Sequence, residues 1–187
     1  MMQMFELERT DMEGLILIHP FYNDDKRGYF LKDYSIDEYQ KMGLDYPIRE
    51  IFYSRSSAGV LRGLHFQCGK PQSKLVRCVS GHIFDVVVDL RKNSKTFKQW
   101  KAFDLKESNP VSILIPFGFA HGFYAIEDSI VSYKCDNCFF SSGDSGIIWN
   151  DLDIGIDWPF DSDPIISDKD RNLQSFRKFM FMFNESV

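Results

Sequence analysis

The sequence lacks any hydrophobic run that approaches the roughly 18 residues of a membrane-spanning helix. It also lacks a basic excess: the net charge is −5 at pH 7, with acids and bases interspersed. We therefore expect neither a membrane nor nucleic acid as a partner, although a local basic pocket could still hold a phosphate. Residues 1–11 carry charges on both sides of an apolar segment too short for a signal peptide, which predicts a cytoplasmic protein.

Cysteine is scarce, with four in 187 residues, and disulfides are not expected in a cytosolic chain of this length. Cys135 and Cys138 have the C-x-x-C spacing of a zinc or redox pair. A structural zinc site requires a second pair at similar spacing, which Cys68 and Cys78 do not supply. A redox pair favours a helix N-terminus, whereas residues 131–135 have the pattern of a strand. We expect ordinary thiols.

No repeat, low-complexity tract or long linker divides the chain, so residues 1–187 are expected to form one domain. The hydrophobic content of 44%, with 18 phenylalanines, is enough for thick sheet packing or a large subunit interface. Short β-type runs separated by turn residues predict an all-β sandwich or barrel. These runs are residues 51–54, 60–66, 74–79, 82–90, 99–105, 111–116, 122–126, 130–135 and 146–149.

The ends of the chain contain different patterns. A strand is predicted at residues 14–18 and a turn at 23–26, followed by a helix at 36–42 that Ser35 would cap. The tail, residues 168–183, is polar and then aromatic, which fits either a helix or an extended arm.

Residues 82–90 alternate, so that Asp85 and Asp89 lie on the same face of the predicted strand as Ile83 and Val87. Two acids on one strand face are either rim residues or part of a polar cavity inside a barrel. Small barrels hold one ligand in that position.

The stretch VLRGLHFQ, residues 60–67, places Arg62 and His65 inside an apolar run. A histidine in such a strand is either a core residue with a hydrogen-bond partner or a general base, since histidine titrates near neutral pH. The stretch alone favours the core residue.

Pro116, Gly118 and His121 have the P-x-G-x-x-H spacing of the second cupin motif. The first cupin motif requires H-x-H followed by a glutamate, but Gln67 stands two positions after His65. No glutamate occurs between His65 and Gly81 either, so two of the usual metal ligands are missing. The chain looks like a cupin barrel without a metal, which leaves both histidines for proton chemistry or anion binding.

With these motifs in order, the sequence resembles the dTDP-4-dehydrorhamnose 3,5-epimerase family, the nucleotide-sugar epimerase branch of the cupins. The resemblance rests on nine segments across nearly the whole chain: residues 25–30, 60–67, 71–77, 84–91, 115–123, 132–135, 146–151, 154–159 and 166–170. It implies a double-stranded β-helix (jelly-roll) barrel with short peripheral helices, no metal and no cofactor. It also implies a homodimer that acts on a nucleotide-diphosphate 4-keto-6-deoxy sugar in deoxysugar biosynthesis for surface polysaccharide.

The resemblance assigns the proton chemistry to four residues. A 4-keto sugar has acidified C–H bonds at C3 and C5, and inversion needs a base on one face and an acid on the other. His65 would be the base, oriented by Asp170, and Tyr133 would be the acid. Lys74 would lie near the C4 oxygen and favour the enolate. Taken singly, these residues also fit a rim tyrosine, a solvated lysine and a carboxylate that caps the tail.

The resemblance also assigns substrate contacts. Four cationic side chains would hold the sugar or its diphosphate: Arg27, Arg62, His121 and Lys169. Asp144 would contact the nucleotide, and Phe139 would stack on the base. A neighbouring subunit would supply Arg27, so that segment 1–50 contributes to the dimer and to the neighbouring site. On sequence alone, Arg27 also fits a surface charge in a hairpin turn.

Some positions depart from the family pattern: Lys32 replaces a glutamate, Glu50-Ile51-Phe52 replaces a Gln-Asp-Asn run, and Cys138-Phe139 replaces a tyrosine pair. The sequence therefore leaves open the nucleotide (dTDP, GDP, CDP or UDP) and whether the sugar is a hexose, a heptose or a 3,6-dideoxy sugar. Because the four proton-transfer residues match the double-acting members of the family, we expect inversion at both C3 and C5, with a single-centre epimerase as the alternative. Other hypotheses are a non-catalytic cupin that binds sugar nucleotides, a 3,4-ketoisomerase, and a cupin with a metal at His65 and His121.

Overall fold

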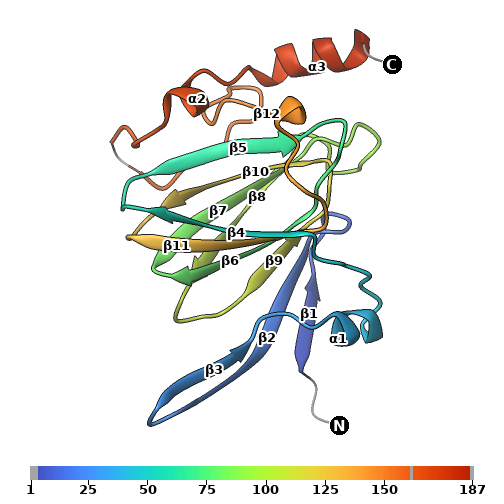
Figure 1. The fold of residues 1–187 in the computed structure, drawn as a ribbon. Coiled ribbons are helices and arrows are strands. Elements are labelled where there is room, and N and C mark those ends of the chain that lie inside the picture. Colours follow the sequence, from blue (N-terminus) through green and yellow to red (C-terminus); the bar gives the residue numbers. More distant parts are fainter. Residues whose placement is uncertain (1–3, 161, 186–187) are drawn as a thin grey trace.

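Two antiparallel β-sheets face each other across a shared core in the computed structural model, which describes residues 4–160 and 162–185 (Figure 1). The seven-stranded sheet has the order β1-β2-β9-β6-β11-β4, with β3 paired to β2. Its strands are β1 (Phe5–Arg9), β2 (Ile16–Asp25), β3 (Gly28–Lys32), β4 (Glu50–Ser56), β6 (Lys74–Ser80), β9 (Ser112–Ile115) and β11 (Ser129–Cys135). The predicted all-β barrel is confirmed.

The five-stranded sheet has the order β12-β5-β10-β7-β8. Its strands are β5 (Leu61–Gln67), β7 (His82–Asp89), β8 (Trp100–Lys106), β10 (Phe119–Ala125) and β12 (Asp144–Gly146). Short helices lie outside the sheets: α1 (Ile36–Lys41), η1 (Ser141–Gly143), α2 (Asp168–Arg171) and α3 (Phe176–Glu185). No helix among the described residues is long and apolar enough to cross a membrane.

The main core lies between the two sheets, where alternate residues of each strand point inward. On β7, Ile83 and Val87 belong to this inner cluster, whereas Val86 and Val88 belong to a second cluster on the outer face of the same sheet. Asp85 follows the inward alternation and is fully buried. The predicted alternation of this strand is therefore confirmed.

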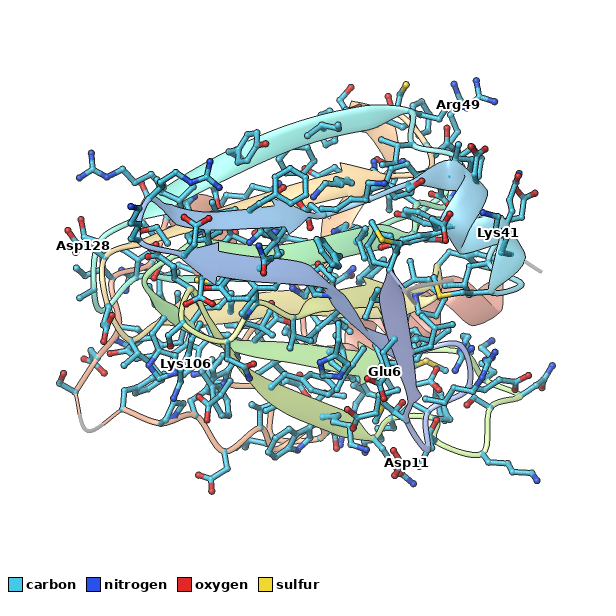
Figure 2. The ribbon with its side chains drawn as sticks, turned by 90° about the horizontal axis from the view of Figure 1, so that it is seen from below. Glu6, Asp11, Lys41, Arg49, Lys106 and Asp128 are labelled. Atoms are coloured by element: carbon cyan, nitrogen blue, oxygen red, sulfur yellow. The ribbon has the colours of Figure 1, made fainter. Side chains whose placement is uncertain are left out.

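Two outer layers cover the barrel. Helix α3 lies along the five-stranded sheet and buries Phe176 and Phe179 against it, which fits the predicted helical tail (Figure 1). Each such phenylalanine contributes about 1.5–3 kcal/mol when fully buried. On the other side, β1, β2 and α1 form a third cluster around Tyr39 and Leu75. Figure 2 shows β1 and β2 across the underside, with the labelled Lys41, Arg49 and Asp128 at the periphery.

Three local predictions need correction. Strand β2 continues through Asn23–Asp25, which pair with β3, so the turn lies at Lys26 and Arg27 rather than at 23–26. Ser35 is the N-cap of α1, but its side chain makes no capping hydrogen bond. Of the predicted strand 146–149, only Gly146 belongs to β12.

Candidate active site

Two adjoining cavities are lined from both sheets and share four lining residues: Phe52, His65, Lys74 and Lys169. The first, of about 350 Å³, is also lined by Phe139 and Asp144. The second, of about 310 Å³, is also lined by Arg62, His121, Tyr133 and Asp170. Every predicted site residue except Arg27 thus lines one or both cavities. Together they offer a base, an acid and several cations around one space, as a nucleotide-sugar site requires.

His65 and Asp170 form a hydrogen-bonded pair. Nε2 of His65, on β5, lies 2.7 Å from Oδ1 of Asp170, on α2. The other carboxylate oxygen accepts a hydrogen bond from the Gly63 backbone N–H at 3.2 Å. Burial would raise the pKa of Asp170, but the hydrogen bond and charge of His65 hold it below its usual value. The carboxylate therefore stays ionised beside the imidazole and orients the ring, with Nδ1 turned away from Asp170.

A close approach of two backbones places both histidines in the site. Gly63 on β5 has φ +125°, and a Cβ there would lie 2.5 Å from the Cα of Gly122 on β10. Glycine at both positions allows the strands to touch. As a result His65 and His121 are direct partners in the β5–β10 ladder. His121 is itself hydrogen-bonded to the buried Asp85, with Nε2 of His121 2.8 Å from Oδ2 of Asp85.

Tyr133 enters the same space from the opposite sheet. It lies on β11, in the core cluster, and its side chain lines the second cavity. Burial raises the pKa of Tyr133 well above its usual value, an effect that the nearby Ser54 hydroxyl and Arg62 guanidinium partly offset. The phenol thus keeps its proton at neutral pH. His65 and Tyr133, from facing sheets, reach one cavity from two sides.

Lys74 points into both cavities without a counter-ion. Among the described residues its ammonium group has neither a hydrogen-bond nor an ion-pair partner. Burial lowers the pKa of Lys74, and the charge of Lys169 adds to that effect, although Cys135, Asp144 and Asp85 oppose it. An unpaired ammonium group at a cavity wall is suited to stabilise negative charge that develops on a bound molecule.

The remaining contacts lie around the rim. Lys169 makes an ion pair with Asp144 across the first cavity. Phe139 is 58% exposed, and its backbone N–H donates to Oε2 of Glu50 at 2.7 Å. Arg62 is held by Ser56 Oγ and the Arg55 carbonyl oxygen. This leaves a flat aromatic ring and cationic groups facing the open side, as a base and a diphosphate would need.

Arg27 is the predicted site residue that does not reach these cavities within this chain. It lies in the β2–β3 turn, and its guanidinium bonds the Asp25 carboxylate, with Nη2 and Oδ2 2.6 Å apart. The hairpin extends away from the barrel (Figure 1). Within this chain, Arg27 therefore contributes to neither of the two cavities.

Two other sequence features are structural or inert. Asp89 does not line either cavity: its carboxylate accepts hydrogen bonds from Arg91, Ser94 and Thr96 and ties a turn together. The cysteines of the C-x-x-C motif are free; Cys138 is exposed, whereas burial raises the pKa of Cys135 to about 12. The described residues contain no group of three or more His, Cys, Asp or Glu side chains placed to hold a metal ion.

The sequence marked Glu50 and Phe52 only as departures from the family pattern, and it gave no signal for Ser54. Phe52 lies in both cavities, Ser54 lines the second beside Tyr133, and Glu50 fixes the Phe139 backbone. All three lie on β4, at alternate positions of one strand. That alternation was visible in the sequence, but which face of β4 met the cavity was not.

The comparison with protein families agrees with this arrangement. The model of the family described as dTDP-4-dehydrorhamnose 3,5-epimerase matches residues 9–178. The chain belongs to this family. The predicted resemblance is confirmed, and so is the enzyme class that it implies, an isomerase that epimerises carbohydrates.

Individual relatives cover almost the whole chain. The dTDP-4-dehydrorhamnose 3,5-epimerase of Methanothermobacter thermautotrophicus is 48% identical over 177 residues, which are 93% of this chain and 96% of that relative. A crystal structure of the dTDP-6-deoxy-D-glucose-3,5-epimerase of Legionella pneumophila, in complex with dTDP-4-keto-L-rhamnose, has a TM-score of 0.89 at 34% identity. It covers 92% of this chain and 93% of that chain. The cupin-like barrel is thus confirmed.

A further structural relative differs in activity. ChmJ, a 3′-monoepimerase from Streptomyces bikiniensis in complex with dTDP-quinovose, has a TM-score of 0.87 at 28% identity, over 93% of this chain and 89% of that chain. The same fold therefore occurs in a protein named as acting at one centre and in proteins named as acting at two.

Proposed function

We propose that the protein inverts both C3 and C5 of a dTDP-linked 4-keto-6-deoxy sugar, in deoxysugar biosynthesis for surface polysaccharide. The observation that carries the proposal is that His65 and Tyr133 line one cavity from two facing sheets, and that the unpaired Lys74 lines the same cavity. Such an arrangement suits proton removal on one face of a ring and proton return on the other. The family relatives named for the dTDP sugar support thymidine as the nucleoside.

The chemistry follows from the geometry. Nδ1 of His65 takes the proton from the carbon next to the ketone, and the electron pair of that C–H bond moves onto the C4 oxygen. The ammonium group of Lys74 stabilises the enolate oxygen. Tyr133 then gives its proton to the same carbon from the opposite face as the carbonyl re-forms. Exchange with water returns the proton to Tyr133 and removes one from His65, so that no net redox change occurs.

The two cavities hold different parts of the substrate. The sugar occupies the second cavity, where Arg62 and His121 lie beside the base and the acid. The nucleotide occupies the first, where Phe139 stacks on the pyrimidine and Asp144 with Lys169 borders it. The diphosphate then lies where the two cavities share Lys74 and Lys169, so that cationic side chains meet its charge.

The proposal is tested in deuterated water. Incubation with dTDP-4-keto-6-deoxy-D-glucose should introduce deuterium at both C3 and C5 and yield dTDP-4-keto-L-rhamnose by NMR. Deuterium at one centre only would assign a single-centre epimerase. If the GDP, CDP or UDP sugars exchanged faster than the dTDP sugar, the nucleotide assignment would be wrong, and absence of exchange from all four would refute the function.

We also propose a cytoplasmic homodimer in which each subunit completes the partner's site with Arg27. The β2–β3 hairpin projects from the barrel and exposes Tyr22, Tyr29 and Phe30, and β4 exposes Tyr53 on its outer face. Exposed apolar side chains gathered in this way are suited to a protein interface. Within its own chain Arg27 contacts only Asp25 among the described residues.

A complementation experiment tests this assembly. Arg27→Ala and His65→Asn homodimers should both be nearly inactive, for different reasons. A mixed dimer should regain one working site, with an intact His65 and an Arg27 from the other subunit. If co-refolded mixtures gain no activity over the separate variants, Arg27 does not act across subunits.

A further inference from the structure

Phe52 and Tyr133 form a stacked aromatic pair at the wall of the site. Phe52 lies on β4, the edge strand, and its Cα is the direct partner of the Tyr133 Cα on β11. The ring centroids are 4.6 Å apart and the planes differ by 13°. Side chains of cross-strand partners point to the same face of a sheet, so the stack follows from the β4–β11 register.

The stack covers one side of the phenol that returns the proton. On another side, the His121 ring meets Tyr133 edge-on, with centroids 6.1 Å apart and planes at 72°. Tyr133 is thus bordered by two rings, one on β4 and one on β10. Phe52 itself remains 39% exposed and lines both cavities, so its outer side faces the space for the substrate.

We propose that Phe52 is a positioning residue for Tyr133, which holds the phenol at the angle needed for proton return. The inference rests on the proposed function and deepens it, because it concerns the second half of the proton transfer alone. His65 lies on the other sheet and is fixed by Asp170. Loss of the Phe52 ring therefore leaves proton removal intact but lets Tyr133 leave its productive orientation.

The measured quantity is the ratio of configurational inversion to deuterium exchange, with the dTDP 4-keto sugar as substrate. Phe52→Leu keeps an apolar side chain but removes the stack. We expect it to lower the ratio about three- to tenfold, the range that corresponds to an aromatic pair. Phe52→Tyr keeps a ring in the same place and should restore the ratio to within about twofold of wild type.

A matched control separates positioning from loss of substrate contact. Phe139→Leu removes another exposed aromatic side chain of the first cavity, which does not touch Tyr133. It should raise KM and leave the ratio of inversion to exchange unchanged. A Phe52→Leu variant that behaves in the same way, with higher KM and unchanged ratio, would show that Phe52 contacts substrate and does not position Tyr133.

A second readout does not depend on turnover. In protein with ring-¹³C tyrosine, the Tyr133 signal is assigned from its absence in Tyr133→Phe. Phe52→Leu should increase the ring mobility of Tyr133 by relaxation measurements, and Phe52→Tyr should not. Unchanged mobility in Phe52→Leu would overturn the inference, whereas wild-type protein that exchanges no sugar proton would instead overturn the proposed function.

Discussion

Asp170 contacts His65 from 105 positions further along the chain, with Oδ1 2.7 Å from Nε2. Its second oxygen binds the backbone N–H of Gly63, on the same strand as His65. The carboxylate is therefore fixed by two groups of β5, and it is 4% exposed. A group held in this way can orient the imidazole and stabilise its protonated form.

Asp170→Asn should preserve the fold but lose this effect. We expect the rate of deuterium exchange to fall by about 10²- to 10⁴-fold, because the amide cannot stabilise the imidazolium that forms during proton removal. KM should change little. The matched control is Asp168→Asn, an exposed acid on the same helix, which should exchange at the wild-type rate. Wild-type exchange in Asp170→Asn would mean that Asp170 only caps the tail segment.

The buried ammonium group of Lys74 should make kcat depend on pH. Since burial lowers the pKa of Lys74 below its ordinary 10.5, the ammonium group is lost at a lower pH than for a solvated lysine. Activity that needs this charge is present below the shifted pKa and declines as pH rises through it. The measurement is kcat against pH from neutral to alkaline conditions.

Two substitutions at Lys74 separate the effect of its charge on kcat from the effect of its titration on the pH profile. Lys74→Gln removes the charge and should lower kcat by about 10²- to 10³-fold at neutral pH. Lys74→Arg keeps a charge that does not titrate, so whatever activity remains should lack the alkaline decline. If the decline persists in Lys74→Arg, another group causes it.

Asp89 predicts an acid-dependent stability that is unrelated to catalysis. Burial would raise its pKa, but hydrogen bonds from Arg91, Ser94 and Thr96 lower it to about 2 from 3.8. Because the folded-state pKa is depressed, the stabilisation is complete above pH 3.8 and is lost as pH falls towards 2. Asp89→Asn should lower the free energy of unfolding at pH 7 by about 2 kcal/mol.

Urea denaturation at pH 7 and near pH 2 checks this expectation. The difference between Asp89→Asn and wild type should shrink at the lower pH. Asp104→Asn is the control, because that side chain is 61% exposed and pairs with His82 at the surface. It should change the free energy of unfolding by at most about 1 kcal/mol. Equal effects of the two substitutions would refute a special role of Asp89.

Gly63→Ala tests the close approach of β5 and β10. The added Cβ would lie 2.5 Å from the Gly122 Cα, so the strands must separate and we expect a loss of about 2–4 kcal/mol of stability. Gly59→Ala is the matched control: its φ is also positive, but the nearest atom to its Cβ, Ile165 Cδ1, is 3.9 Å away. It should cost about 1 kcal/mol. Similar thermal unfolding of the two variants would contradict the argument.

The barrel was predictable because its strands have strong local signals. Alternation put Asp85 on the same face as Ile83 and Val87, which the structure shows to be the inner face. Runs such as 74–79 and 130–135 fell within a residue of β6 and β11. The predicted strand limits were wrong where the polarity of the side chains does not match the backbone pairing of the strand. Asn23–Asp25 have turn-type side chains, yet they pair with β3 in the projecting hairpin. Ile147 belongs to the cluster that contains Phe176 and Phe179 of the tail, and it forms an isolated bridge with Gln174 instead of continuing β12.

The site was predictable residue by residue only through the resemblance to the family. Composition and spacing left His65 as a core histidine or a base, since its partner Asp170 lies in a distant helix. The stack of Phe52 on Tyr133 depends on the register between β4 and β11, which no local hairpin fixes. Register between distant strands is a tertiary property, so only the structure could place Phe52.

The most direct test of the account is Tyr133→Phe in deuterated water, with exchange and product configuration measured in parallel. In the proposed mechanism, His65 removes the proton and Tyr133 returns one from the opposite side of the same cavity. This mechanism predicts that the variant still introduces deuterium into the 4-keto sugar with retained configuration, while net inversion falls much further. Equal losses of exchange and inversion would contradict it, because Tyr133 would then be needed to form the enolate.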